Sequence, residues 1–376
     1  MHQRKSFYLA LALLTLTLLT GCFGEDKLKE AVDAYTARLS RVLDTTLTVS
    51  APPESLRFPD RARLHQVIEP ININLREFYA IDECELSTLI AQRNTTLGKS
   101  QLPSQRFAYE STLNRVLNDC KSALRLQESD RYAVVNGWYE KKQAQFGAVW
   151  ANMIQTSNEM KLGLSVSDRL LNADKNKDAQ ASITALYYLD SLLNSLSENL
   201  ARNDSNSTFP DSDTISSSNE PSTPSTRLSK EIETQLHIIA SSRLPATMWN
   251  TQTYLTRSLS ALTASLEPAL EEISCPNGRA SDAAKIARNV FYLFFINEIQ
   301  PIGSALNNYH YKLLPLWQKW QTNNELQPAF KAYISAYTET GFAAYQAAMS
   351  NHVVLWQGFL ARCNLSPTAP SVQPTS

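Results

Sequence analysis

Apolar residues recur every three or four positions along most of the chain, the spacing that places side chains on one face of an α-helix. No stretch alternates apolar and polar residues in the manner of a half-buried strand. We therefore predict an all-α fold, an elongated antiparallel bundle of long helices. The segments with helical spacing are 28–42, 60–93, 104–124, 130–154, 183–200, 255–273, 281–301 and 326–359.

One internal segment breaks the helical pattern. Of the 25 residues in 203–227, 12 are Ser or Thr and three are Pro. Burying so few apolar residues does not offset the conformational entropy that the segment would lose on ordering. We therefore predict a disordered linker, with helices resuming at Ser229. The predicted parts of the chain are a signal peptide (1–21), an N-terminal helical half with a disulfide-linked hairpin (22–202), the linker (203–227), a C-terminal helical half (228–365) and a disordered tail (366–376).

The N-terminus has the features of a bacterial lipoprotein signal. Arg4 and Lys5 precede an apolar run, 7–19, that is too short to span a bilayer comfortably. The run ends in Leu-Thr-Gly-Cys22, which looks like a lipobox whose cysteine receives acyl chains such as palmitate. By resemblance to the bacterial sorting rule, Phe23 rather than Asp predicts the periplasmic face of the outer membrane. The alternative is an ordinary signal peptide with a coincidental cysteine.

Four further cysteines predict two disulfides, because the count is even and the predicted compartment is oxidising. Cys84 and Cys120 lie equally far from the turn between two helices, centred near Leu102, so they sit at one level of the hairpin. Cys275 and Cys363 each follow a helix end, and these ends share one pole if the C-terminal helices run up, down and up. The alternatives are free thiols or, less favoured without a Cys-x-x-Cys motif, zinc.

Composition excludes several classes of function. Apolar residues are 43% of the chain, enough for a sizeable core, and the net charge of −1 disfavours nucleic acid as a partner. Only 10 glycines are present, which argues against phosphate-cradling loops and dinucleotide folds. We predict no cofactor beyond the covalent lipid on Cys22.

Motifs for catalysis and metal binding are incomplete. Gly98-Lys99-Ser100 matches only the end of a P-loop, and 174–185 lacks the glycine and glutamate of a calcium loop. No zincin or Gly-x-Ser-x-Gly motif occurs. Glu85 and Glu110 would provide paired carboxylates for glycoside hydrolysis, but ion pairing is the favoured interpretation. We therefore predict no metal, no catalytic residue and no enzyme activity.

The tip of the predicted hairpin concentrates polar residues. Arg93 and Glu110 lie at one level and are predicted to form an ion pair, with Ser104 capping the following helix. The remaining polar residues of the tip are predicted to be exposed: Asn94, Lys99, Ser104, Gln105 and Arg106. They either cap helices and interact with solvent or contact a partner, and the candidate contact residues are Arg93, Asn94, Lys99, Ser104, Arg106 and Glu110.

Residues 60–125 resemble a family of Gram-negative bacterial lipoproteins, domain of unknown function 3080. The resemblance is carried by Cys84-Glu-Leu, by 93–99 (Arg-Asn-Thr-Thr-Leu-Gly-Lys), by 103–106 (Pro-Ser-Gln-Arg) and by 109–110 (Tyr-Glu). The lipobox, the helix after it and the pair Cys84 and Cys120 fit the family too. The family has no assigned activity, so the resemblance implies a lipoprotein and assigns no catalytic residue.

The favoured function is an interaction or assembly module of the cell envelope. It is anchored to the membrane by its acyl chains and presents a rigid helical surface to an envelope protein partner. One alternative is a binding protein for an apolar envelope ligand, with its pocket in the aromatic C-terminal half, 291–359. An envelope hydrolase is the least favoured.

Overall fold

The computed structural model describes residues 27–49, 56–71, 73, 84, 86–95, 98, 100–165, 167–201 and 223–366. Within these residues the chain is helical with no strand, which confirms the predicted all-α class. No helix of the described part combines the length and the apolar character that crossing a bilayer requires. The predicted signal peptide, Cys22, Glu85, Lys99 and most of the predicted linker lie outside the described residues.

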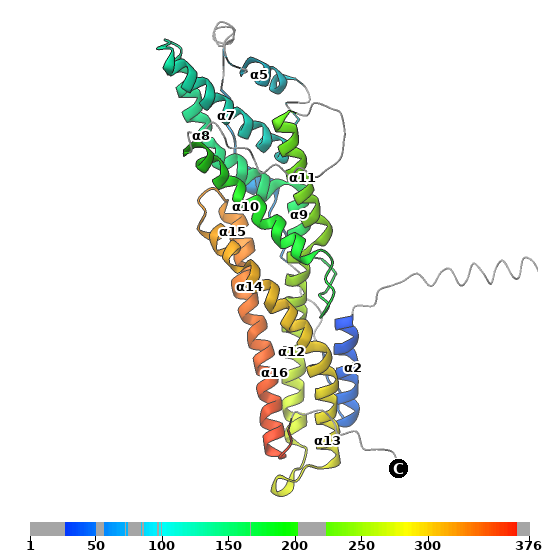
Figure 1. The fold of residues 1–376 in the computed structure, drawn as a ribbon. Coiled ribbons are helices and arrows are strands. Elements are labelled where there is room, and N and C mark those ends of the chain that lie inside the picture. Colours follow the sequence, from blue (N-terminus) through cyan, green and yellow to red (C-terminus); the bar gives the residue numbers. More distant parts are fainter. Residues whose placement is uncertain are drawn as a thin grey trace, which may run out of the picture.

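The N-terminal half is built around a long helical hairpin. Helices α7 and α8 run antiparallel and pack along their length, and α5 lies beside α7 (Figure 1). Helix α11, from the C-terminal half, packs against α7, α9 and α10. The helices of the N-terminal half are α2 (Lys27–Val42), α3 (Arg61–Leu64), α5 (Leu86–Asn94), α7 (Pro103–Leu126), α8 (Tyr132–Thr156), α9 (Asn158–Leu164) and α10 (Ala179–Ala201).

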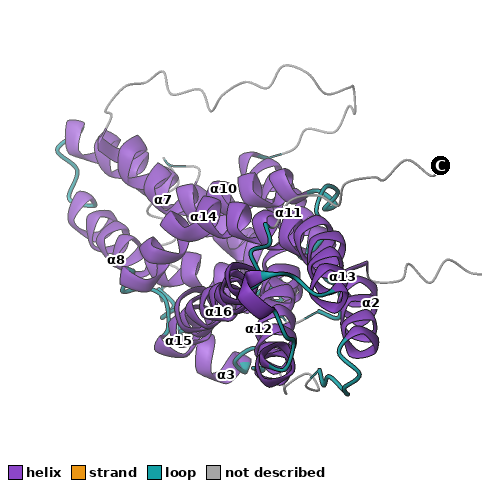
Figure 2. Cartoon of the chain, turned by 90° about the horizontal axis from the view of Figure 1, so that it is seen from below, coloured by secondary structure: helices purple, strands orange, loops and turns teal. Residues whose placement is uncertain are grey.

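The C-terminal half contains α11 (Pro224–Ser242) followed by three long rods. The first rod is α12 (Leu244–Glu271). The second joins α13 (Asp282–Val290), the π-helix η2 (Phe291–Ile299) and α14 (Gln300–Thr322). The third joins α15 (Pro328–Ser335), the π-helix η3 (Ala336–Gly341) and α16 (Phe342–Arg362). Helix α2 packs against the second rod, and α12 lies along α16 (Figure 2).

The molecule is elongated, and one apolar core runs through both halves (Figure 1). Trp150 of α8 meets Trp320 of α14 edge to face, with ring centroids 6.5 Å apart. A smaller apolar cluster lies apart from this core between α5, α7 and α8, and includes Leu86, Leu113 and Leu117. The two halves therefore form one bundle, with a separate small cluster beneath α5.

Aromatic residues of the C-terminal half pack against one another as core. Trp249 stacks on Tyr337 with centroids 4.7 Å apart, and Phe291 stacks on Trp356 at 4.6 Å. Stacked pairs of this kind contribute beyond their buried area. The aromatic density that would suit a ligand box is thus used for packing between the three rods.

Both predicted disulfides are present. Cys84 is bonded to Cys120 and Cys275 to Cys363, with Cα atoms 5.6 and 5.2 Å apart. The second bridge confirms that the C-terminal rods run up, down and up, since it joins the residues that follow α12 and α16. The first fastens the start of α5 to α7.

The predicted helix over 60–93 is wrong in its first part. Helix α3 ends at Leu64, His65 has extended backbone angles, and residues 65–71 are not helical. The reason is a pair of side chains on α8. Asn152 accepts a hydrogen bond from the Gln66 amide and donates to its carbonyl, both at 2.8 Å, and Gln155 donates to the Leu64 carbonyl at 2.6 Å. These amides replace the helical hydrogen bonds of the segment.

Two further boundaries differ from the predictions. Helix α11 begins at Pro224, three residues before the predicted end of the linker at 227. Thr223 caps this helix by accepting a hydrogen bond from the Thr226 amide, and proline suits the first helical position. Ser104 is not the cap of α7, because Leu102 and Pro103 start that helix, and Gln105 accepts from the Leu102 amide. Short helix α9 and both π-helices were not predicted.

Candidate functional site

A pocket of about 910 Å³ lies between α5, α7, α8 and the chain around Ile68–Ile71 and Ile73. We call it the basic pocket. Its polar lining residues are Arg93, Asn94, Thr95, Arg106, Tyr109, Glu110 and Lys142, and its apolar lining residues are Ile68, Pro70, Ile71, Ile73, Leu86, Ile90, Ala91, Leu113, Leu117 and Trp138. Its volume falls in the usual range for small-molecule sites.

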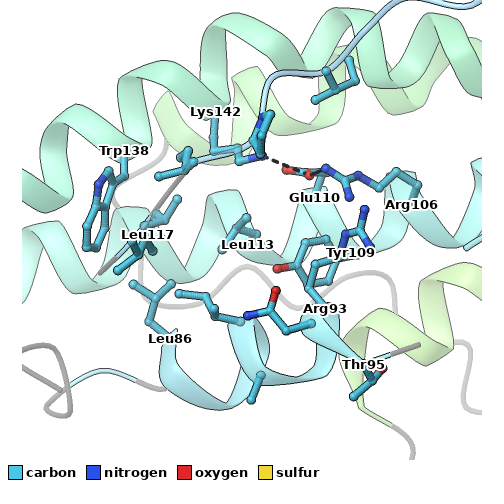
Figure 3. A pocket seen from close by; sticks show the side chains of 17 residues that line it. Leu86, Arg93, Thr95, Arg106, Tyr109, Glu110, Leu113, Leu117, Trp138 and Lys142 are labelled. Carbon is cyan, nitrogen blue, oxygen red and sulfur yellow. Dashed lines mark hydrogen bonds and ion pairs between the residues drawn. The ribbon is translucent and has the colours of Figure 1, made fainter. Parts of the chain in front are cut away.

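Glu110 lies at the centre of the charged end of the pocket. Its side chain forms ion pairs with Arg106, one turn earlier on α7, and with Lys142 of α8, whose Nζ lies 3.2 Å from Oε1. Glu110 is 1% exposed and Lys142 5% exposed. Arg93 of α5 lies on the same side of the pocket and donates to the Gly98 carbonyl (Figure 3). Three cationic side chains and one carboxylate therefore line this end of the pocket, and two of the cations pair with that carboxylate.

Burial shifts the titration of this end of the pocket. Burial lowers the pKa of the Lys142 ammonium, although Glu110 opposes that change. Burial, and next the neighbouring Arg106, lowers the pKa of the Arg93 guanidinium. Burial, with a further contribution from Glu110, raises the pKa of the Tyr109 phenol to about 12. The positive charges are thus held where water stabilises them poorly.

The opposite end of the pocket is apolar. Leu113 and Leu117 continue the face of α7 that carries Glu110, and Leu86 and Trp138 approach from α5 and α8 (Figure 3). The Cys84–Cys120 disulfide lies at this end, because Cys120 is three residues beyond Leu117 on α7. It holds α5 against α7 and so helps to keep the pocket walls in place.

The structure brings together four of the six predicted contact residues. Arg93, Asn94, Arg106 and Glu110 line the pocket. The predicted Arg93–Glu110 ion pair is wrong, because Glu110 pairs with Arg106 and Lys142 instead.

The predicted exposure of the tip is also wrong for Ser104, for Arg106 and for Gln105, which is half-buried and donates to Glu233 of α11. Ser104 is buried and bonds at 3.3 Å to Glu233 of α11, which packs over this end of α7. Arg106 is only partly exposed, because its guanidinium turns toward Glu110. Asn94 is exposed as predicted.

Lys142, Tyr109 and Trp138 were missed by the sequence analysis. Lys142 lies seven residues after Val135 and seven before Val149, both of which are buried, so it occupies an apolar position of α8. A charged residue in such a position needs a buried partner. That signal pointed to a cluster with Glu110, which likewise follows Phe107 on the inner face of α7.

A second buried polar cluster lies in the core, away from the pocket. His352 of α16 bonds through Nε2 to the Tyr35 hydroxyl at 3.0 Å and through Nδ1 to Thr263 at 2.9 Å. Its ring is fully buried, and burial lowers its pKa to about 3. The cluster joins α2, α12 and α16, and its inaccessibility indicates a structural role.

This burial makes stability depend on pH. His352 stays neutral in the folded chain, whereas the unfolded chain binds a proton below about pH 6.5, so stability is lost as the pH falls below that value. We expect His352 to contribute a loss of about 2 kcal/mol between pH 6.5 and 5. Urea unfolding at pH 7 and 5 measures it.

The control for this prediction is the exposed His237. The His352→Gln chain should lose less stability between pH 7 and 5 than wild type, whereas His237→Gln should match wild type. An unchanged pH dependence in His352→Gln would contradict the prediction.

Within the described part of the chain, no three His, Cys, Asp or Glu residues gather closely enough to hold a metal ion. Residues 174–177 line a second, shallower hollow together with Tyr309 and Lys312. There Asn176 binds the Asn172 backbone instead of presenting a ligand set.

A sequence profile described as "Protein of unknown function (DUF3080)" matches residues 32–219 and 207–367 of the chain. The match extends well beyond the region of residues 60–125 and includes both the basic pocket and the three C-terminal rods. No curated protein and no solved structure matches the chain.

Proposed function

We propose that this chain, which belongs to the DUF3080 family of proteins of unknown function, is a lipid-anchored binding protein of the bacterial cell envelope. Its helical body carries the basic pocket as the recognition site for a negatively charged envelope component. The observation that supports this best is the excess of positive charge in the pocket, whose described lining contains three cations and one carboxylate. A bound anion would balance that charge.

The proposed activity is binding without chemistry. Among the described lining residues, Glu110 is the one that carries a carboxylate. It already forms ion pairs with Arg106 and Lys142 of the same pocket. A carboxylate engaged in this way is poorly placed to take a proton from a substrate. The envelope-module role predicted from the sequence fits the same geometry, because a tethered rigid body holds its partner close to the membrane.

Cross-linking in intact cells tests the pocket. A photo-reactive amino acid at Ala91, an exposed lining residue, should give a mass adduct that mass spectrometry detects. Adding Arg93→Gln should reduce the adduct about 10-fold, since a hydrogen bond from a charged group contributes roughly 1.5–3 kcal/mol.

Two matched controls separate the pocket from the general surface. The same probe at exposed Ser122 of α7 should give no such adduct. Arg115→Gln, which removes an exposed arginine of α7 paired with Asp119, should leave the Ala91 adduct unchanged. Equal loss of the adduct in Arg93→Gln and Arg115→Gln would overturn the proposed recognition.

The membrane anchor rests on the lipobox before Cys22. The Cys22→Ser chain is expected to escape lipidation and to accumulate as the unprocessed precursor. Acyl labelling with fractionation of the envelope checks this. Normal processing and pelleting of Cys22→Ser with the outer membrane would contradict the anchor.

A further inference from the structure

We propose that the ligand of the basic pocket is a small amphiphile: one carboxylate or phosphate headgroup attached to an apolar tail. This inference rests on the proposed function and adds the chemical class of the ligand. It is supported by the division of the pocket into two ends of opposite character, which Figure 3 shows along α7.

The charged end suits a compact anion. Arg106 and Lys142 already hold Glu110, so Arg93 supplies the charge that no carboxylate of the described lining pairs with. A guanidinium has five donors in a planar fork, and Arg93 uses a donor of one nitrogen for the Gly98 carbonyl. The fork matches the oxygens of carboxylate and phosphate. Tyr109 adds a hydroxyl beside it.

The apolar end suits a tail without hydrogen-bonding groups. From Glu110 to Leu117 the α7 face advances by about 10 Å, at 1.5 Å per residue. Over that distance the wall includes Leu113 and Leu117 of α7, Leu86 and Ile90 of α5, and Trp138 of α8. A hydrocarbon tail would gain about 25 cal/mol for each Å² removed from water there.

This wall disfavours a peptide as the occupant. A peptide carries a donor and an acceptor on nearly every residue, and the leucine and isoleucine side chains offer neither. A polyanion such as nucleic acid is disfavoured because the pocket has a small net charge and the whole chain is near neutral. The two-ended lining therefore favours one charge and one tail.

Titration calorimetry with defined probes tests the inference. The protein is the oxidised polypeptide from residue 23 onward, which keeps every described helix and both disulfides. Decanoate and decyl phosphate carry head and tail, acetate and inorganic phosphate carry the head alone, and decanol carries the tail alone. Decyltrimethylammonium tests the sign of the charge.

We expect decanoate or decyl phosphate to bind at least about 10-fold more tightly than each single-part probe and than the cationic one. Arg93→Gln and Ala91→Glu should each weaken that binding about 10-fold or more, since both make the pocket less positive. Arg115→Gln, on the exposed surface of α7 and outside the pocket lining, is the matched control and should bind as wild type. Binding should quench or shift the fluorescence of Trp138, and Trp138→Phe should remove that signal while calorimetry still detects binding.

The outcomes separate this inference from the proposed function. If acetate or inorganic phosphate binds as tightly as decanoate or decyl phosphate, the ligand is not an amphiphile, but anion recognition stands. The same conclusion follows if no probe binds while the Ala91 adduct still depends on Arg93. If no probe binds and the adduct is absent or independent of Arg93, both fail. Equal binding of decyltrimethylammonium would also refute the inference.

Discussion

Replacing Glu110 with glutamine is expected to lower the free energy of unfolding by about 3–5 kcal/mol, the usual cost of removing one partner of a buried ion pair. Lys142 would be left charged and 5% exposed without its carboxylate. Arg106 is partly exposed to solvent, so losing its ion pair with Glu110 should cost less stability than losing the Lys142 pair. Urea unfolding at neutral pH measures the change.

An exposed pair on the same helix is the control. Asp119 pairs with Arg115 at 3.5 Å on the surface of α7, and Asp119→Asn should change stability by less than about 1 kcal/mol. Adding Lys142→Met to Glu110→Gln should restore part of the loss, because a neutral side chain then replaces the buried charge. A loss below about 1 kcal/mol in Glu110→Gln would show that water reaches the cluster.

Removing the Cys275–Cys363 disulfide by double alanine substitution is expected to cost about 4–5 kcal/mol in the loop-entropy model. The bridge closes 88 residues, whereas Cys84–Cys120 closes 36, for which the same model gives about 4 kcal/mol. The unfolded chain gains more freedom when the longer loop opens. Denaturant unfolding of the two double variants checks the order.

The two bridges should differ more in function than in stability. The Cys84–Cys120 bridge holds α5 beside the pocket, and the other lies at the far pole, where α12 and α16 end. Loss of the first should weaken probe binding, and loss of the second should leave it unchanged in chains that remain folded. The reverse result would contradict the assigned role of the N-terminal bridge.

Pairing of the cysteines was predictable from the sequence because it depends on helix geometry. Cys84 and Cys120 are bonded as predicted, although Cys84 lies just before α5, so a constant helical rise covers α7 and only part of the arm from Cys84 to the turn. The up-down-up order of three rods similarly brings Cys275 to Cys363. Register along regular helices is a local property, so local reasoning sufficed where the arms are regular helices, as in the C-terminal rods.

The basic pocket was predictable only in part. The hairpin tip identified Arg93, Asn94, Arg106 and Glu110. Lys142 was missed, although its place at an apolar position of α8 was a signal. Which cation meets Glu110 was not predictable, because that choice depends on how α8 packs against α7 and on the length of each side chain. Ser104 was misplaced for the same reason, since α11 arrives from far along the chain.

The sequence by itself determined the all-α class, the positions of most helices, both disulfides and the family resemblance, because apolar periodicity and helical rise act within a few turns of chain. Only the tertiary structure decided the non-helical segment 65–71, the burial of Glu110 and Lys142, and the two-ended pocket that they help to line. In each case side chains remote in sequence compete with local preference. Asn152 and Gln155 take the backbone of 64–66 away from the helix, and a cation from α8 displaces Arg93 from Glu110. Such competition is settled by packing between elements, which no local pattern encodes.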